Sequence, residues 1–467
     1  MRELSVTAAA REGWDTPALV FGDESWSWVE LARRVTAEMA ALGRLGLGRP
    51  GGPPRVRLVA RATPELVVRL LALVQLGVTV VPLHARWTSA ERAAVAALDP
   101  VAWDLDSLPA TTRPARFLPL VDHRKIPPGR PLAVVFTSGS SAEPKGVILS
   151  RAAFVASAAA GAARLGWQAG DRWLLSLPPA HVGGLSVLVR CLVARRTVVL
   201  AEEGLDAAGL VGLMRDTRVT LVSLVAPMLG RLVEAGEVLP SLRAVLLGGG
   251  PCPTGLVRAA RAAGWPVLAT YGLTETCSQV ATQVPGEVAD PDDVAAPPLP
   301  GVELRIAEGR IQVRGEMLMA GYFPRGRHDE PFTDDGFLAT GDLGAIDGRG
   351  CLRVLGRADD LIVTGGENVS PVEVEEALLR CPGVTQALVF GAPTEPWGQV
   401  VAAALVPGQE GPLPGQRLGE ALGGLAPFKR PRLVAWVPEL PLGTNGKPDR
   451  RRAAAELRGA LRPLASG

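Results

Sequence analysis

Five polar segments, far apart along the chain, combine residue types that can handle a nucleotide. They are TSGSSAEPKG at 137–146, YGLTETCSQ at 271–279, TGDL at 340–343, GRADDLIVTGGENVSP at 356–371 and LGTNGKPDR at 442–450. Their side chains would supply a phosphate-binding loop, an aromatic and acidic nucleotide site, a ribose-binding carboxylate, a hinge and a remote lysine. Together these parts would serve to activate a carboxylic acid with ATP.

The first segment follows the apolar strand LAVVF and is typical of an anion-binding loop. Its hydroxyl, glycine and lysine residues are Thr137, Ser138, Gly139, Ser140, Ser141 and Lys145. Hydroxyls and backbone N–H groups can surround phosphate oxygens while the lysine adds a point charge. The loop is not of the Walker type, because Pro144 stands where that motif needs glycine and Gly146 where it needs Ser or Thr. Taken alone, the segment also fits a polar surface loop.

The second segment follows the predicted strand WPVLAT. The ring of Tyr271 could stack on a purine, and Thr274 with Glu275 could meet a phosphate and a magnesium ion. Alternatively, Tyr271 belongs to the core and Glu275 begins a helix. Upstream, Gly249 and Gly250 in VLLGGGPCP would let a flat ligand approach the backbone closely. This spacing differs from GxGxxG, which disfavours a dinucleotide site.

The remaining candidates are single charged residues. Asp342 and Arg357 could bind a ribose diol and stabilise the nucleotide, although each alone is more often an ordinary surface charge. Near the C-terminus, the turn formed by Asn445 and Gly446 would lift Lys447 onto a mobile loop. A cation there would help where a carboxylate attacks the α-phosphate and negative charge builds up. A solvated lysine is the alternative.

Composition predicts a soluble, multidomain globular chain. The 467 residues are 47% apolar and 21% charged, with a net charge of +2, which favours neither a nucleic acid nor a membrane partner. The N-terminus is charged where a signal peptide needs an apolar run, and the most apolar stretch, 70–83, is too short to cross a bilayer, so we expect a cytoplasmic location.

The cysteines form no CxxC pair, which argues against disulfides and zinc. They are Cys191, Cys252, Cys277, Cys351 and Cys381.

Helical runs alternate with short β-branched strands, a rhythm that indicates an α/β fold with largely parallel sheets. The pairs are 66–77 with 78–83, 185–195 with 196–200, and 240–242 with 243–250. We expect a large N-terminal body of doubly wound sheets over 1–356. Residues 357–467 follow a mixed pattern of strands and an acidic helix that begins at Pro371, which predicts a small α+β domain.

In order and over essentially the whole chain, the five segments resemble the adenylate-forming family of acyl-CoA synthetases, nonribosomal adenylation domains and luciferases. The resemblance implies that residues 357–467 are a mobile lid that pivots between two half-reactions. In the first, an acid and Mg²⁺-ATP give acyl-AMP and pyrophosphate. In the second, a thiol such as that of coenzyme A (CoA) attacks the mixed anhydride and AMP leaves.

The same resemblance assigns a role to each motif residue. It implies that residues 138–145 hold the β and γ phosphates and that Tyr271 stacks on adenine. It assigns Thr274 and Glu275 to phosphate and magnesium. It implies that Asp342 binds the ribose and that Arg357 also contacts the nucleotide. The hinge would be Asp359, and the lysine required for adenylation would be Lys447. Gly365 and Gly366 would line the passage for the thiol. The chain departs from most relatives at Ser141 and Ala142, where Thr and Gly are usual, so the phosphate loop is expected to be stiffer.

Within this family, the runs 177–190, 271–282 and 356–375 look most like the o-succinylbenzoate–CoA ligases of menaquinone biosynthesis. Such a substrate carries a second, non-reacting carboxylate, which a buried pocket must match with a polar or cationic wall. The candidates are His181, Arg190 and Ser278. His181 could instead be structural or gating, and Arg190 fits a solvated helix position better.

Other interpretations remain open at this stage. A benzoate-type or medium-chain acyl-CoA ligase would use the same motifs with a more apolar pocket, and a carrier protein could replace CoA. A nucleotide-binding protein without turnover is disfavoured by the intact Lys447, Glu275 and Asp342. A homodimer is one possible assembly.

Overall fold

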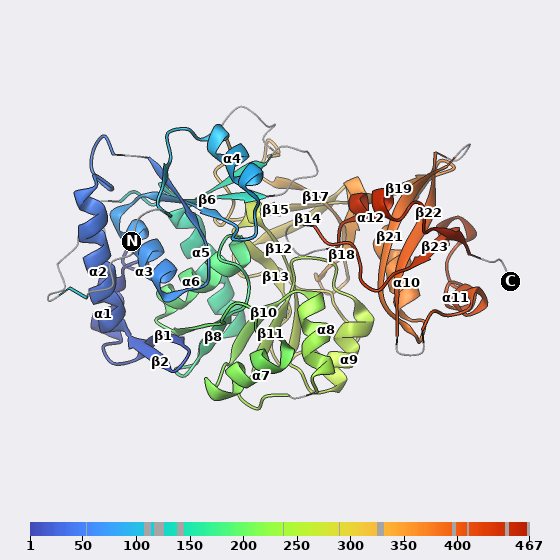
Figure 1. Ribbon diagram of the computed structural model, residues 1–467, viewed down its shortest axis with the longest axis horizontal. Coiled ribbons are helices and arrows are strands. Elements are labelled where there is room, and N and C mark those ends of the chain that lie inside the picture. Colours follow the sequence, from blue (N-terminus) through green and yellow to red (C-terminus); the bar gives the residue numbers. More distant parts are fainter. Residues whose placement is uncertain are drawn as a thin grey trace.

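The computed structural model describes residues 1–52, 54–106, 114–115, 126–137, 144–236, 238–288, 290–324, 331–394, 398–408, 411–443 and 448–464. Within them, the N-terminal part holds two large mixed sheets with helices between and outside them (Figure 1). The helices of this part are α1 (Val6–Glu12), α2 (Trp28–Arg44), α3 (Pro64–Leu76), α4 (Ser89–Leu98), α5 (Arg151–Leu165), α6 (Val182–Ala194), α7 (Ala207–Asp216), α8 (Ala226–Glu234) and α9 (Thr254–Ala262).

The larger sheet has eight strands, which run parallel except for the two edge strands β2 and β13. In spatial order they are β13 (Ser278–Thr282), β12 (Val267–Leu273), β11 (Ala244–Leu247), β10 (Leu221–Leu224), β8 (Arg172–Leu175), β9 (Thr197–Leu200), β1 (Pro17–Phe21) and β2 (Glu24–Ser27). The parallel strands are buried on both faces, as β-branched and leucine-rich strands of an α/β fold are expected to be.

The second sheet has six strands, parallel from β5 to β6 and antiparallel at β7 and β16. In order they are β16 (Tyr322–Phe323), β7 (Lys145–Ser150), β6 (Pro131–Thr137), β4 (Thr79–Leu83), β3 (Arg55–Val59) and β5 (Trp103–Asp104). One buried cluster joins both sheets through α3 and α6, with Val80 and Leu268 from the sheets and Leu70 and Leu185 from the helices. The predicted α/β body is confirmed.

A four-stranded antiparallel sheet follows in the chain. Its order is β14 (Glu303–Ala307), β15 (Arg310–Arg314), β17 (Leu338–Ile346) and β18 (Leu352–Arg357). The strands of this sheet are largely half-exposed and lack a continuous apolar run, so the periodicity of the sequence does not reveal them as a sheet.

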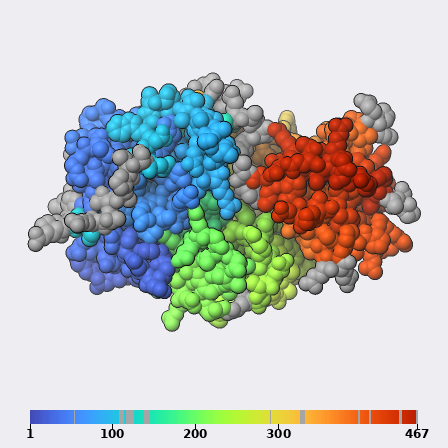
Figure 2. Space-filling model, in the orientation of Figure 1, coloured from blue at the N-terminus to red at the C-terminus, as the bar shows by residue number. Residues whose placement is uncertain are grey.

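The C-terminal sheet consists only of residues after 361 and lies at the opposite end of the molecule from α1 and α2 (Figure 1). Its strands are β20 (Glu367–Val369), β19 (Ile362–Thr364), β22 (Gly398–Pro407), β23 (Leu433–Trp436) and β24 (Arg462–Pro463), with β21 (Val384–Thr394) paired to β22. Its helices are α10 (Pro371–Leu379), α11 (Gly415–Ala421) and α12 (Arg450–Glu456). Figure 2 shows this part as a lobe against the body.

The lobe meets the body through α10, which contacts β18 and α9. Ser370 precedes α10 at its N-cap, yet its hydroxyl does not cap that helix. The Ser370 Oγ instead donates to the Leu355 carbonyl of β18 at 2.9 Å.

Two local expectations are wrong. Residues 240–242 form a turn, and the helix that precedes β11 is α8. The strand predicted as WPVLAT begins at Val267 and continues through Leu273, because residues 270–273 pair with β13. Among the described residues, no helix has both the length and the apolar character needed to cross a bilayer.

Candidate functional site

The motif YGLTETCSQ folds into a tight strand–turn–strand. Tyr271 lies in β12, the turn is a short 3₁₀ segment at Thr274–Thr276, and Ser278 begins β13. The buried Thr276 hydroxyl closes the turn, since it accepts from the Leu273 N–H at 2.9 Å and donates to the Ser278 carbonyl at 2.8 Å. Cys277 and Ser278 have φ values of 51° and 93°, a left-handed backbone that non-glycine residues seldom adopt. Such strain is typical of functional turns.

Gly272 is required for this turn. A Cβ at that position would lie 1.9 Å from the Ser278 carbonyl oxygen and 2.7 Å from the Gln279 Cα. We therefore expect Gly272→Ala to lower the free energy of unfolding by about 3 kcal/mol, measured by urea denaturation. Gly255→Ala in α9, where a Cβ would meet nothing within 4 Å, is the control and should cost no stability. Equal stability of the two variants would contradict this account.

Asp342 lies on β17 and is bonded to Tyr271 and Arg357. The Tyr271 hydroxyl donates to Asp342 Oδ2 at 2.8 Å, and Arg357 Nη1 donates to Asp342 Oδ1 at 3.4 Å. Asp342 is only 6% exposed, so its interpretation as a surface charge is wrong. Burial raises the pKa of the Asp342 carboxyl, and the hydroxyl of Tyr271 and the charge of Arg357 partly offset this rise. Burial and the charge of Asp342 raise the pKa of Tyr271, so its hydroxyl remains a donor.

Glu275 and Lys145 are connected through Tyr322. The Tyr322 hydroxyl donates to Glu275 Oε1 at 3.0 Å, and Lys145 Nζ lies 5.8 Å from the centroid of the Tyr322 ring. Glu275 is in the 3₁₀ turn rather than at the start of an α-helix. Tyr322 was not among the residues predicted for the site. Its only signal in the sequence is rarity, because the chain has two tyrosines and the other is Tyr271.

The predicted phosphate loop connects β6 to β7. Thr137 ends β6 and is paired with Lys145, which begins β7. The loop residues Ser138, Gly139, Ser140 and Ser141 lie outside the described residues. Thr137 and Lys145 therefore stand side by side where the loop leaves and rejoins the sheet. Lys145 is connected to Glu275 through Tyr322.

Arg190 is buried, and the expectation of a solvated side chain is wrong. It is 4% exposed, and its guanidinium carbon lies 5.7 Å from the centroid of the Trp173 ring. Nη2 donates to Ser157 Oγ at 3.4 Å, and that hydroxyl donates to the Cys277 carbonyl at 2.8 Å, which links Arg190 to the motif turn. Nε has no hydrogen-bond partner among the residues that the structure describes. Burial lowers the Arg190 pKa to about 10, so the side chain remains a cation at neutral pH.

The other two candidates for acid binding, His181 and Ser278, lie at the starts of α6 and β13. His181 is the N-cap residue of α6, the helix that carries Arg190, and its ring centroid lies 5.1 Å from that of His84. Burial lowers the pKa of His84, so this neighbour is neutral at physiological pH. Ser278 is half-buried at the start of β13.

The predicted hinge lies directly after β18. Arg357 precedes the 3₁₀ turn Ala358–Asp360, and its Nη2 donates to Asp359 Oδ2 at 3.1 Å. Arg450, which begins α12, donates to both oxygens of the buried Glu375, to the Val389 carbonyl at 2.9 Å and to Asp360 Oδ2 at 3.3 Å. The hinge is thus tied to the helix that follows the loop of Lys447. Lys447 itself lies outside the described residues.

The predicted glycines are split between the two parts of the molecule. Gly365 and Gly366 form the exposed turn of the β19–β20 hairpin, with φ values of 59° and 88° that suit a two-residue turn. They lie in the C-terminal sheet, whereas Glu275 lies in the 3₁₀ turn and Asp342 on β17. Gly249 and Gly250 are exposed at the end of β11.

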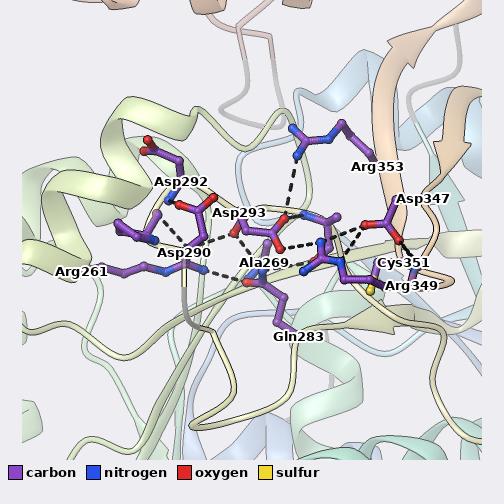
Figure 3. Close-up of polar contacts among 12 residues, drawn as sticks. Arg261, Ala269, Gln283, Asp290, Asp292, Asp293, Asp347, Arg349, Cys351 and Arg353 are labelled. Atoms are coloured by element: carbon purple, nitrogen blue, oxygen red, sulfur yellow. Dashed lines mark hydrogen bonds and ion pairs between the residues drawn. The ribbon is translucent and has the colours of Figure 1, made fainter.

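A polar network outside the site holds its strands in place (Figure 3). Gln283 Oε1 accepts from the Ala269 N–H of β12 at 2.8 Å and from Arg261 of α9 at 2.7 Å. Arg261 also donates to the Asp293 carbonyl at 2.9 Å, and the Asp293 carboxylate accepts from Arg349 at 2.7 Å. Arg349 lies in the turn between β17 and β18, so the network fixes β12 relative to the strand that carries Asp342.

Comparison with known proteins gives matches over nearly all of the chain. Residues 6–99 and 90–323 match the family model AMP-binding enzyme, and residues 373–447 match the AMP-binding enzyme C-terminal domain. The 2-succinylbenzoate–CoA ligase of Bacillus pumilus (strain SAFR-032) is 34% identical over 463 residues, which cover 93% of this chain and 94% of that enzyme.

Two solved structures are similar throughout. The o-succinylbenzoate CoA synthetase from Bacillus subtilis in complex with the acyl-adenylate intermediate OSB-AMP superimposes with a TM-score of 0.83 at 30% identity, covering 99% of each chain. The synthetase from the same organism in complex with ATP and magnesium ion gives a TM-score of 0.82 at 30% identity, covering 96% of this chain and 98% of the other.

Proposed function

The chain belongs to the family of AMP-binding enzymes, among which it falls with the 2-succinylbenzoate–CoA ligases, and on that premise we propose that it joins o-succinylbenzoate to CoA at the expense of ATP. The reaction is a step of menaquinone biosynthesis, and the supply of ATP and CoA favours the cytoplasm as its location. The observation that carries the choice of acid is the buried Arg190, which lacks a carboxylate partner among the described residues. A substrate with a second carboxylate would supply that partner.

In the first half-reaction, a carboxylate oxygen of the acid attacks the α-phosphorus of ATP. The bond from the α-phosphorus to the bridging oxygen breaks, and pyrophosphate leaves. Tyr271, Asp342 and Arg357 bind the nucleoside end. Thr137 and Lys145, with the loop between them, hold the β and γ phosphates, while Thr274 contacts phosphate. Lys447 stabilises the charge that builds up at the α-phosphate.

Glu275 is the residue that would hold the magnesium ion of ATP. The described residues contain no group of three His, Cys, Asp or Glu that could bind a metal by itself. Magnesium is commonly bound by one or two carboxylates together with substrate phosphates, so a single carboxylate fits this role. The bound ion neutralises part of the triphosphate charge.

In the second half-reaction, the CoA thiol, once deprotonated, attacks the acyl carbon, and the bond to the AMP oxygen breaks. We propose that residues 1–356 act as the body and residues 357–467 as a lid that turns about Asp359 between the two steps. Gly365 and Gly366 would then line the passage for the thiol arm. The separate sheet formed by residues after 361 supports this division. His181 and Ser278 complete the proposed acid pocket beside Arg190.

The test is a panel of acids with ATP, magnesium and CoA, with pyrophosphate release and thioester formation as readouts. The panel contains o-succinylbenzoate, benzoate, 4-hydroxycinnamate and octanoate. We expect strong preference for o-succinylbenzoate. Preference for benzoate or octanoate would leave the proposed adenylation reaction standing but would show that the acid is not o-succinylbenzoate. A second assay, with a phosphopantetheinylated carrier protein in place of CoA, tests which thiol accepts the acyl group. Sedimentation of the same preparation tests for a homodimer.

Asp359→Pro should separate the half-reactions. Proline fixes φ near −65°, a value that suits the 3₁₀ turn seen here, so the substitution should hold the lid in one state. We expect acyl-AMP formation to persist and thioester formation from supplied acyl-AMP to fall about tenfold or more. Asp359→Ala, which also loses the Arg357 contact but leaves φ free, is the matched control. A wild-type ratio of the two rates in the proline variant would contradict a hinge at this position.

A further inference from the structure

Both tyrosines of the chain donate their hydroxyls to carboxylates of the site. Tyr271 donates to Asp342 at 2.8 Å and Tyr322 donates to Glu275 at 3.0 Å. By the roles proposed above, the first pair serves the nucleoside. The second pair, whose tyrosine ring lies 5.8 Å from Lys145 Nζ, serves the phosphates.

The backbone around Tyr322 is bonded to both elements that carry the phosphate-end residues. Tyr322 is paired with Val147 and Phe323 with Gly146 in the strand that begins at Lys145. On the other side, the Met319 N–H donates to the Glu275 carbonyl at 2.8 Å. The short segment 319–323 therefore spans from β7 to the 3₁₀ turn of the motif.

The side chain of Tyr322 makes the same two connections. The Tyr322 hydroxyl donates to Glu275 Oε1 at 3.0 Å. That bond fixes the rotamer of the Glu275 carboxylate, while the ring face attracts the Lys145 ammonium. One side chain thus sets the spacing between an anionic and a cationic group.

We propose that Tyr322 is a positioning residue for the magnesium pyrophosphate end of ATP. This inference rests on the proposed function and assigns different roles to Tyr322 and Tyr271 within it. Glu275 and Lys145 serve the β and γ phosphates, which leave with pyrophosphate, so Tyr322 matters only in the first half-reaction. Tyr271 orients Asp342 at the nucleoside, which stays bound through both half-reactions.

The test compares Tyr322→Phe with Tyr271→Phe, since each variant removes one hydroxyl from one carboxylate. In ATP–pyrophosphate exchange, Tyr322→Phe should raise the magnesium concentration for half-maximal rate about tenfold. Its rate of thioester formation from supplied acyl-AMP should stay within about twofold of wild type. Tyr271→Phe should slow both half-reactions alike. Equal losses in the two half-reactions for Tyr322→Phe, or an unchanged magnesium requirement, would overturn the proposal.

A binding measurement makes the test independent of the acid. The thermal midpoint should rise with Mg²⁺-ATP and with AMP in the wild type. In Tyr322→Phe, the rise with Mg²⁺-ATP should shrink while the rise with AMP stays the same. If the thermal midpoint of Tyr322→Phe rose with Mg²⁺-ATP as much as that of the wild type, the role of Tyr322 would be refuted, even if the enzyme prefers another acid. Failure of the wild type to respond to either nucleotide would instead refute the proposed function.

Discussion

Replacement of Arg190 by Met should raise the KM for o-succinylbenzoate about 100-fold, equivalent to about 2.7 kcal/mol, because the non-reacting carboxylate would be buried without its cation. The kcat for benzoate, which has no second carboxylate, should change little. Stability should not fall, since among the described residues the buried guanidinium makes a single hydrogen bond, of 3.4 Å, and an apolar side chain of similar length avoids its desolvation. Steady-state kinetics with both acids and urea unfolding measure the three effects.

Two controls sharpen this result. Arg231→Met removes an exposed arginine from α8 and should leave both KM values unchanged. Arg190→Lys keeps the charge but loses the planar fork, so it should recover only part of the affinity. If Arg190→Met weakened benzoate and o-succinylbenzoate equally, Arg190 would be structural and the acid pocket would have to lie elsewhere.

Replacement of Lys447 by Ala should slow acyl-AMP formation by about 10²- to 10³-fold, the effect expected when one stabilising donor is removed from a transition state that gains charge. Thioester formation from supplied acyl-AMP should be nearly unchanged, because the lysine would have moved away with the lid. The two rates are measured separately, by pyrophosphate exchange and by thioester absorbance.

Lys429→Ala is the matched control for Lys447. It removes a lysine of the same lobe that pairs with Glu373 at 2.7 Å, and it should leave acyl-AMP formation unchanged. Equal loss of both half-reactions in Lys447→Ala would refute its assignment to adenylation alone. Such a result would indicate that the loop supports the site as a whole.

The nucleotide motifs, their order and the α/β body were predictable because their signals are local. A hydroxyl-rich loop after an apolar strand and alternating helix and strand periods each occupy a short window of sequence. The resemblance to adenylate-forming enzymes follows from that order, and its confirmation by the family match covers both parts of the chain. Local pattern also placed the helix that begins at Pro371.

Only the tertiary structure decided which of these residues meet. Tyr322 is 47 residues from Glu275, and Tyr271 is 71 residues from Asp342, so no window of sequence contains either pair. The burial of Arg190 depends on the packing of α5, α6 and β8 around it, and on a helix surface an arginine is ordinarily solvated. Residue types and their order are properties of the sequence, whereas burial and partners arise when distant segments pack together.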